Sequence, residues 1–114
     1  MNKGQSQDTT IWTVESTTES VIDKLTKVNS KQYNLLKAAE ELQELSLALT
    51  QKINKPSRNN DEAIIDEIGD VIIRIKVLKK LFNKKAINTR VDTKLKSYQK
   101  LIDKGLVGTQ FIGI

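Results

Sequence analysis

The sequence predicts an all-α fold, an antiparallel helical bundle of about four helices. Apolar residues recur at helical rather than alternating spacing, for example at Ile64, Ile68, Val71, Ile75 and Leu78. The stretch before them is rich in Leu, Ala, Glu, Gln and Lys, which all favour helices. The breaks between the periodic segments are short, and short connections favour antiparallel neighbours in a bundle.

The first two helices follow a polar N-terminal stretch. Residues 1–17 are rich in Thr, Ser and Gln, and we expect them to form an irregular arm. The segment "TTESVIDKLTKV" then begins with threonines that can cap a short first helix. Ser30 can cap a second helix, which we expect to end near Lys52.

The third helix follows Pro56, which cannot continue the second one. Asn59 and Glu62 have the spacing of a capping box with asparagine in the cap position. We therefore expect this helix to run from about residue 60 to residue 82 or 83.

The fourth helix is expected after a short turn, "KKAINT". Thr89, three residues before an aspartate, signals its start, and Gly105 is its stop after Lys104. Residues 18–104 then form one helical domain. Residues 105–114 form a C-terminal tail that is apolar and interrupted by glycine.

The composition limits the chemistry. The 114-residue chain contains no cysteine and no histidine, which excludes thiolate metal sites, disulfides and Ser-His or Cys-His nucleophiles. A net charge of +5 suggests polyanionic partners, either phosphorylated small molecules or nucleic acid, although a solvated lysine surface has the same composition. No apolar run approaches the roughly 20 residues of a membrane span, and the first residues lack a signal-peptide pattern. We therefore expect a soluble, cytoplasmic protein.

Acidic residues interrupt the most apolar parts of the second and third predicted helices. The segment "KAAEELQEL" carries Glu40, Glu41 and Glu44, with leucine and alanine on both sides of the acidic stripe. At about 100° per residue, Glu67 falls inside the apolar stripe of the third helix, and Asp70 is its neighbour on the same face. Carboxylates in such positions are costly unless a partner compensates them.

Two further features of these helices carry expectations. The main apolar face of the second helix is expected largely opposite the acids, and it is made of Leu35, Ala38, Ala39, Leu42, Leu45 and Leu49. Gly69 is unusual in mid-helix, where it costs about 1 kcal/mol against alanine. We expect it where another helix or a ligand approaches closely.

Several carboxylates in one interior need either basic partners or a divalent cation. Arg74 and Lys94 can supply one or two positive charges, which is too few for all the acids. Oxygen ligands without His or Cys select Mg²⁺, Mn²⁺ or Ca²⁺ over zinc. Mg²⁺ commonly bridges to substrate phosphates, which would connect an acidic interior with a basic surface.

The segments "EELQE" (residues 40–44) and "EIGD" (residues 67–70) resemble the "EExxE … ExxD" signature of the MazG-like all-α nucleoside triphosphate pyrophosphohydrolase superfamily. The likeness covers about residues 30–104. It implies a helical bundle that oligomerises, usually as a dimer or tetramer. It also implies a Mg²⁺-dependent nucleotide pyrophosphohydrolase that cleaves (d)NTPs at the α–β phosphate bond into NMP and pyrophosphate.

The resemblance implies the site residues as well. Glu41, Glu44, Glu67 and Asp70 would be the metal ligands for Mg²⁺, with Mn²⁺ as a substitute. Glu40 would act with Glu41 in catalysis, either as a further ligand or by positioning the attacking water.

The resemblance is less complete on the substrate side. Lys94 is the best match to a phosphate-binding lysine on the last helix of the family, and Arg74 is the second candidate for substrate binding. Many relatives carry an asparagine four residues beyond that lysine, where this chain has Tyr98. This departure leaves the base of the nucleotide open.

Two other readings stay open. A non-catalytic helical nucleic-acid-binding or regulatory protein fits the basic charge, but its interior acids would repel phosphate without a metal. A degenerate family member that acts as a scaffold fits the helical pattern, but it has no reason to keep carboxylates in its core.

Overall fold

The computed structural model describes residues 14–105, with side chains from residue 18 onward. Four helices occupy this range and no strand occurs in it: α1 (Val14–Val28), α2 (Lys31–Asn54), α3 (Asp61–Leu81) and α4 (Lys84–Asp103). The all-α prediction is therefore confirmed for the described part. The expected C-terminal tail after residue 105 and the first 13 residues of the expected arm lie outside it.

The chain divides into two compact units, Met1–Phe82 and Asn83–Ile114. The first unit contains α1, α2 and α3, and the second contains α4. Each unit is described by itself.

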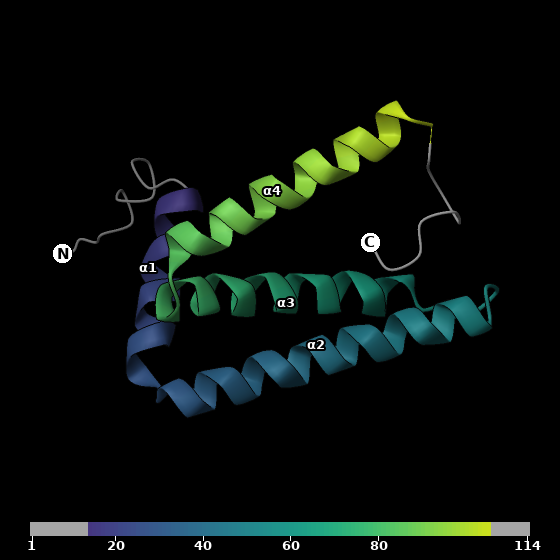
Figure 1. The fold of residues 1–114 in the computed structure, drawn as a ribbon. Helices are drawn as coiled ribbons and strands as arrows, with labels where there is room; N and C mark the ends of the chain where they lie inside the picture. The colour runs from purple at the N-terminus through teal and green to yellow at the C-terminus, as the bar shows by residue number, and fades with distance from the viewer. Residues whose placement is uncertain (1–13, 106–114) are drawn as a thin grey trace. The chain divides into compact units, whose positions relative to one another are not determined.

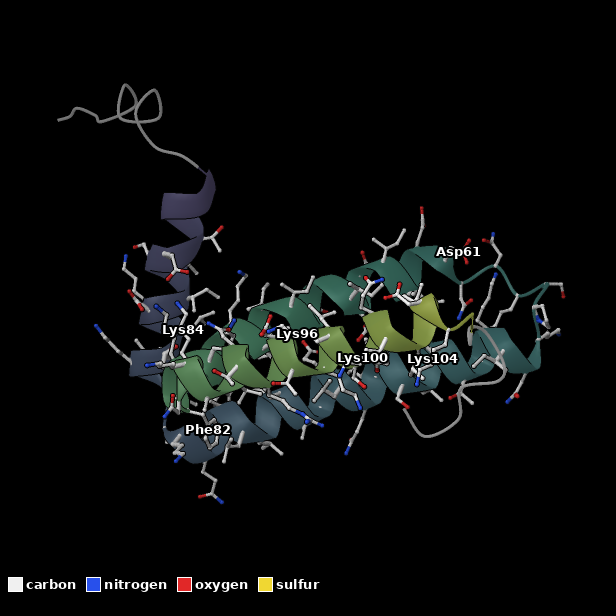
Figure 2. All side chains as sticks on the ribbon, turned by 45° about the horizontal axis from the view of Figure 1, so that its top comes forward. Asp61, Phe82, Lys84, Lys96, Lys100 and Lys104 are labelled. Carbon is white, nitrogen blue, oxygen red and sulfur yellow. The ribbon has the colours of Figure 1, made fainter. Side chains whose placement is uncertain are left out.

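In the first unit, α2 and α3 lie side by side and form a helical hairpin (Figure 1). Near the connecting loop, the Asn60 amide nitrogen donates to the backbone carbonyl of Ala48 at 3.2 Å. At the other end, the Lys31 ammonium lies 4.9 Å from the centre of the Phe82 ring. Asp61 and Phe82 mark the two ends of α3 (Figure 2). As the residue number rises along α2, the number of the residue opposite it on α3 therefore falls.

The face of α2 that packs in the hairpin matches the expected apolar face only in part. Ala38 of that face is buried and Leu45 is partly buried, whereas Leu35, Leu42 and Leu49 are between 40% and 45% exposed. The covered residues recur every three or four positions and include small ones: Asn34, Ala38, Glu41, Leu45 and Ala48. Small side chains let two helices approach closely. The number of large apolar residues on a helix face is therefore a poor guide to the side that packs.

Helix α1 packs on α3. The Lys80 ammonium bridges to the carboxylates of Glu19 at 2.9 Å and Asp23 at 3.0 Å, which connects the two helices. Ile22 and Val77 are buried, Val77 completely. The helix begins at Val14, so residues 14–17, expected in the irregular arm, are helical.

The capping predictions have mixed outcomes. The Ser30 hydroxyl accepts from the Tyr33 amide at 3.1 Å, which confirms Ser30 as the N-cap of α2. The capping box at Asn59 is wrong, because the N-cap of α3 is Asn60. The side chain of Asn60 makes no capping bond. Its Nδ2 atom donates to the Ala48 carbonyl, and its Oδ1 atom, which could cap the helix, is buried without a partner among the described residues.

Helix α4 starts five residues earlier than Thr89, its expected start. The Asn83 side-chain oxygen accepts from the Ala86 amide at 2.9 Å, so the true N-cap precedes the supposed turn. The stretch "KKAINT" contains neither proline nor glycine, so nothing in it prevents helix formation. Gly105 has φ +76°, which confirms it as the residue that ends the helix.

Helix α4 carries two kinds of surface. Val91, Leu95, Tyr98 and Ile102 recur at helical spacing and are 38% to 59% exposed. Lys96, Lys100 and Lys104, four residues apart, extend from the same helix (Figure 2). None of the described helices is both long enough and apolar enough to cross a membrane.

Candidate metal centre

Three carboxylates from two helices come together in the hairpin. Glu41 projects from α2, and Glu67 and Asp70 project from successive turns of α3. One oxygen atom of each lies within 4.8 Å of the others, and all three residues are partly buried. The central pairing expected from the sequence, of an acid on the second helix with "ExxD" on the third, is thus present.

The covered position of Glu67 agrees with the sequence prediction. Its neighbours on α3, Ile64 and Val71, are partly buried like Glu67 itself. Its Oε2 atom is buried and has no hydrogen-bond partner among the described residues. A buried acceptor without a donor is costly, and a cation is the partner that satisfies it best.

The pKa of Glu41 depends on its burial and on the charges around it. Its pKa is raised above the ordinary carboxyl range, first by desolvation and then by its hydrogen bond with Glu44. The negative charges of Asp70 and Glu44 raise the pKa further, whereas Lys37 opposes them. Burial is thus the main cause of the raised pKa, and the neighbouring carboxylate charges add to it.

Glu44 and Glu40 lie at the edge of this group. Glu44 is exposed and reaches the cluster through Glu41, as a fourth oxygen donor could. The Glu40 carboxylate lies 3.0 Å from the Lys37 ammonium and is not one of the three clustered acids. Its predicted role beside the attacking water stays a prediction.

Two cationic side chains, Arg74 and Lys37, lie one helical turn from the clustered acids. Arg74 is one turn beyond Asp70 on α3, and its Nη1 atom is buried without a hydrogen-bond partner among the described residues. Lys37 is one turn before Glu41 on α2, and sequence reasoning missed it. The signal was available, because Lys37 shares the helix face of Glu41, but its relevance depends on where α3 packs.

Two other residues singled out from the sequence, Lys94 and Gly69, are not part of the acidic cluster. Lys94 belongs to the second unit, where its ammonium lies 5.6 Å from the centre of the Tyr98 ring. A Cβ atom added at Gly69 would meet no atom within 4 Å in the described part of the chain. The expected close approach of another helix at Gly69 is therefore not present there.

The donor set fits a hard divalent cation. Three carboxylates provide oxygen ligands from two sides and leave room in an octahedral shell for water and phosphate, as Mg²⁺ and Mn²⁺ prefer. The buried Oε2 atom of Glu67, which has no hydrogen-bond donor among the described residues, is available as one of these ligand atoms. Zinc, by contrast, would lack its usual nitrogen and sulfur ligands.

Comparisons of the chain with protein-family models, with curated proteins and with solved structures gave no match.

Proposed function

We propose that this protein is a Mg²⁺-dependent nucleoside triphosphate pyrophosphohydrolase, which splits (d)NTPs at the α–β phosphate bond into NMP and pyrophosphate. One observation carries the proposal: Glu41, Glu67 and Asp70 lie within 4.8 Å of one another. These are three of the four acids that the resemblance assigns to the metal, the fourth being Glu44. The reaction itself comes from the resemblance, and the geometry supports its requirement for a cation site.

The residues divide into groups with different tasks. Glu41, Glu67 and Asp70 would hold Mg²⁺, with Glu44 beside them. When bound, the cation supplies Lewis-acid neutralisation of charge on the phosphate oxygens. Mn²⁺, with the same preference for oxygen ligands, would substitute.

Carboxylates also accept the proton that hydrolysis releases. Glu41 and Glu40, neighbours in the chain, are the proposed catalytic carboxylates, and Glu40 lies outside the three clustered acids. Water oxygen attacks the α-phosphorus, and the bond from that phosphorus to the bridging oxygen breaks. The electron pair leaves with pyrophosphate, and Arg74 and Lys94 are the proposed donors to phosphate.

The proposal includes assembly into a homo-oligomer, as a dimer or tetramer whose helices close into an antiparallel bundle. The exposed apolar stripe of α4, with Val91, Leu95, Tyr98 and Ile102, supports it because such a stripe favours burial against another helix. Sedimentation equilibrium of the full chain tests it, and a monomer at all concentrations would contradict it.

The test of the activity is pyrophosphate release from a panel of NTPs and dNTPs, with Mg²⁺ and with EDTA. Glu67→Gln and Asp70→Asn should reduce release to the EDTA level, because each removes a ligand charge. Asp66→Asn, an exposed acid next to Glu67, is the matched control and should act like the wild type. A folded wild type that releases no pyrophosphate from any nucleotide of the panel would refute the proposal.

A further inference from the structure

The two cations beside the carboxylates lie on the same side of them. Lys37 precedes Glu41 by four residues on α2, and Arg74 follows Asp70 by four residues on α3. The helices of the hairpin run in reverse order, so both steps lead toward its Lys31–Phe82 end. Each step is one helical turn, about 6 Å. A positive layer thus adjoins the acidic one.

Arg74 has an unused donor in this layer. Its Nη1 atom is buried without a partner among the described residues, which is costly for a charged group. Asp70 has the i,i+4 spacing to form an ion pair with it, yet the Asp70 carboxylate lies with Glu41 and Glu67 instead. Glu67 is two turns away along the same helix and is therefore no substitute.

Lys37 faces the same layer from α2. Its ammonium is partly exposed and lies 3.0 Å from the Glu40 carboxylate. The positive charge of Arg74 lowers the pKa of Lys37, although Glu40 raises it more strongly. The geometric reason for an anion here is the buried Nη1 atom of Arg74, which lacks an acceptor among the described residues and which an anion between the two cations would satisfy.

We propose that Lys37 and Arg74 form the binding site for the pyrophosphate end of the substrate, so that the phosphates run from the carboxylates toward the Lys31–Phe82 end of the hairpin. The inference rests on the proposed function, because the carboxylates must hold the cation at the bond that is cleaved. One helical turn is a distance that one or two linked phosphate groups span. The nucleoside then lies toward the Ala48–Asn60 end.

The site formed by Lys37 and Arg74 would interact most strongly with the phosphates while the bond to the α-phosphorus breaks. The bond between the α-phosphorus and the bridging oxygen gives its electron pair to pyrophosphate, so negative charge grows on the leaving group. The planar guanidinium of Arg74 can donate two parallel hydrogen bonds to phosphate oxygens, and Lys37 adds a mobile point charge. Donors that meet charge where it develops stabilise the transition state more than the bound substrate.

The test measures two affinities for the full chain and its variants. Mn²⁺ binding is measured by electron paramagnetic resonance, and binding of inorganic pyrophosphate by calorimetry with Mg²⁺ present. Arg74→Gln and Lys37→Gln should each weaken pyrophosphate by about tenfold or more, which corresponds to about 1.4 kcal/mol, and should not weaken Mn²⁺. Lys76→Gln, at an exposed position two residues after Arg74, is the matched control.

The outcomes separate this inference from the function. Unchanged pyrophosphate affinity in both variants would overturn it, and stronger Mn²⁺ binding alone would mean that the cations only neutralise the acids. Weakened pyrophosphate binding in a protein that hydrolyses no nucleotide would support the anion site and reject the activity. Circular dichroism checks the fold, and the partly exposed Lys37 keeps the test valid if Arg74→Gln unfolds.

Discussion

Replacing Glu67 by glutamine should change the free energy of unfolding in opposite directions with and without metal. The Glu67 carboxylate lies within 4.8 Å of those of Glu41 and Asp70. At that distance two unit charges repel by about 1 kcal/mol in bulk water and by about 3.5 kcal/mol at an effective dielectric constant of 20. The pKa of Glu41 is raised first by desolvation, and the charge of Asp70 contributes to the rise.

The partly buried site lies between those dielectric limits. In EDTA at low ionic strength, Glu67→Gln should therefore raise the free energy of unfolding by about 1 to 3 kcal/mol. With Mg²⁺ at about 100 times its dissociation constant, the wild type should gain about 2.7 kcal/mol. The variant should gain much less, because it has lost a ligand charge.

Urea denaturation in EDTA and in Mg²⁺ measures both effects. Asp66→Asn, which removes an exposed charge next to Glu67, should follow the wild type in both conditions. Two results would refute the reasoning: a Glu67→Gln variant that is less stable in EDTA, or a wild type that Mg²⁺ does not stabilise.

Three further predictions concern a titration, a cap and a glycine. In EDTA, the free energy of unfolding should fall as pH rises from the ordinary carboxyl range through the raised pKa of Glu41, because the folded chain keeps a proton there that the unfolded chain has lost. Urea titrations of Glu41→Gln across that range should give a flatter slope, and an equal slope would contradict the assignment. Asn83→Ala should cost the first turn of α4 about 1 kcal/mol, read as faster amide exchange at Ala86, whereas Asn88→Ala should leave that amide unchanged. Gly69→Ala should stabilise the chain by about 1 kcal/mol in thermal or urea denaturation, because an added Cβ meets open space within the described residues; destabilisation would indicate a partner on that face.

Periodicity along one helix was the most reliable guide. It predicted the helices of the described part and placed Glu67 among covered apolar residues, because each helix shows which of its residues share a face. It was incomplete for the packed side of α2, where Ala38 of the expected face is buried but Leu35 and Leu42 are exposed, and where Ala48, outside that face, is buried as well. The face of α2 that packs depends on how closely α3 can approach it. The number of apolar residues on each face of α2 does not show this.

Contacts between neighbouring helices explain other differences between the sequence expectations and the structure. Lys37 gains its significance from the turn of α3 that lies opposite, and no pattern within α2 reveals that register. The side chain of Asn60 is oriented by its bond to the Ala48 carbonyl on the neighbouring helix, a contact that the sequence does not show. Asn83 is recognisable from the sequence, since asparagine followed by helix-favouring residues is a common N-cap and a stronger signal than Thr89.

All three clustered acids belong to one hairpin, and that hairpin is closed by its own loop. The Lys52 ammonium binds the Arg58 carbonyl at 2.8 Å and the Asp61 carboxylate at 3.1 Å, so the turn is held from both sides. Contacts between neighbouring segments form early in folding because little chain entropy is lost in closing a short loop. We therefore expect the acids to meet early in folding, where their repulsion would oppose the closing of the hairpin. If Mg²⁺ binds them as proposed, it should accelerate refolding as well as slow unfolding.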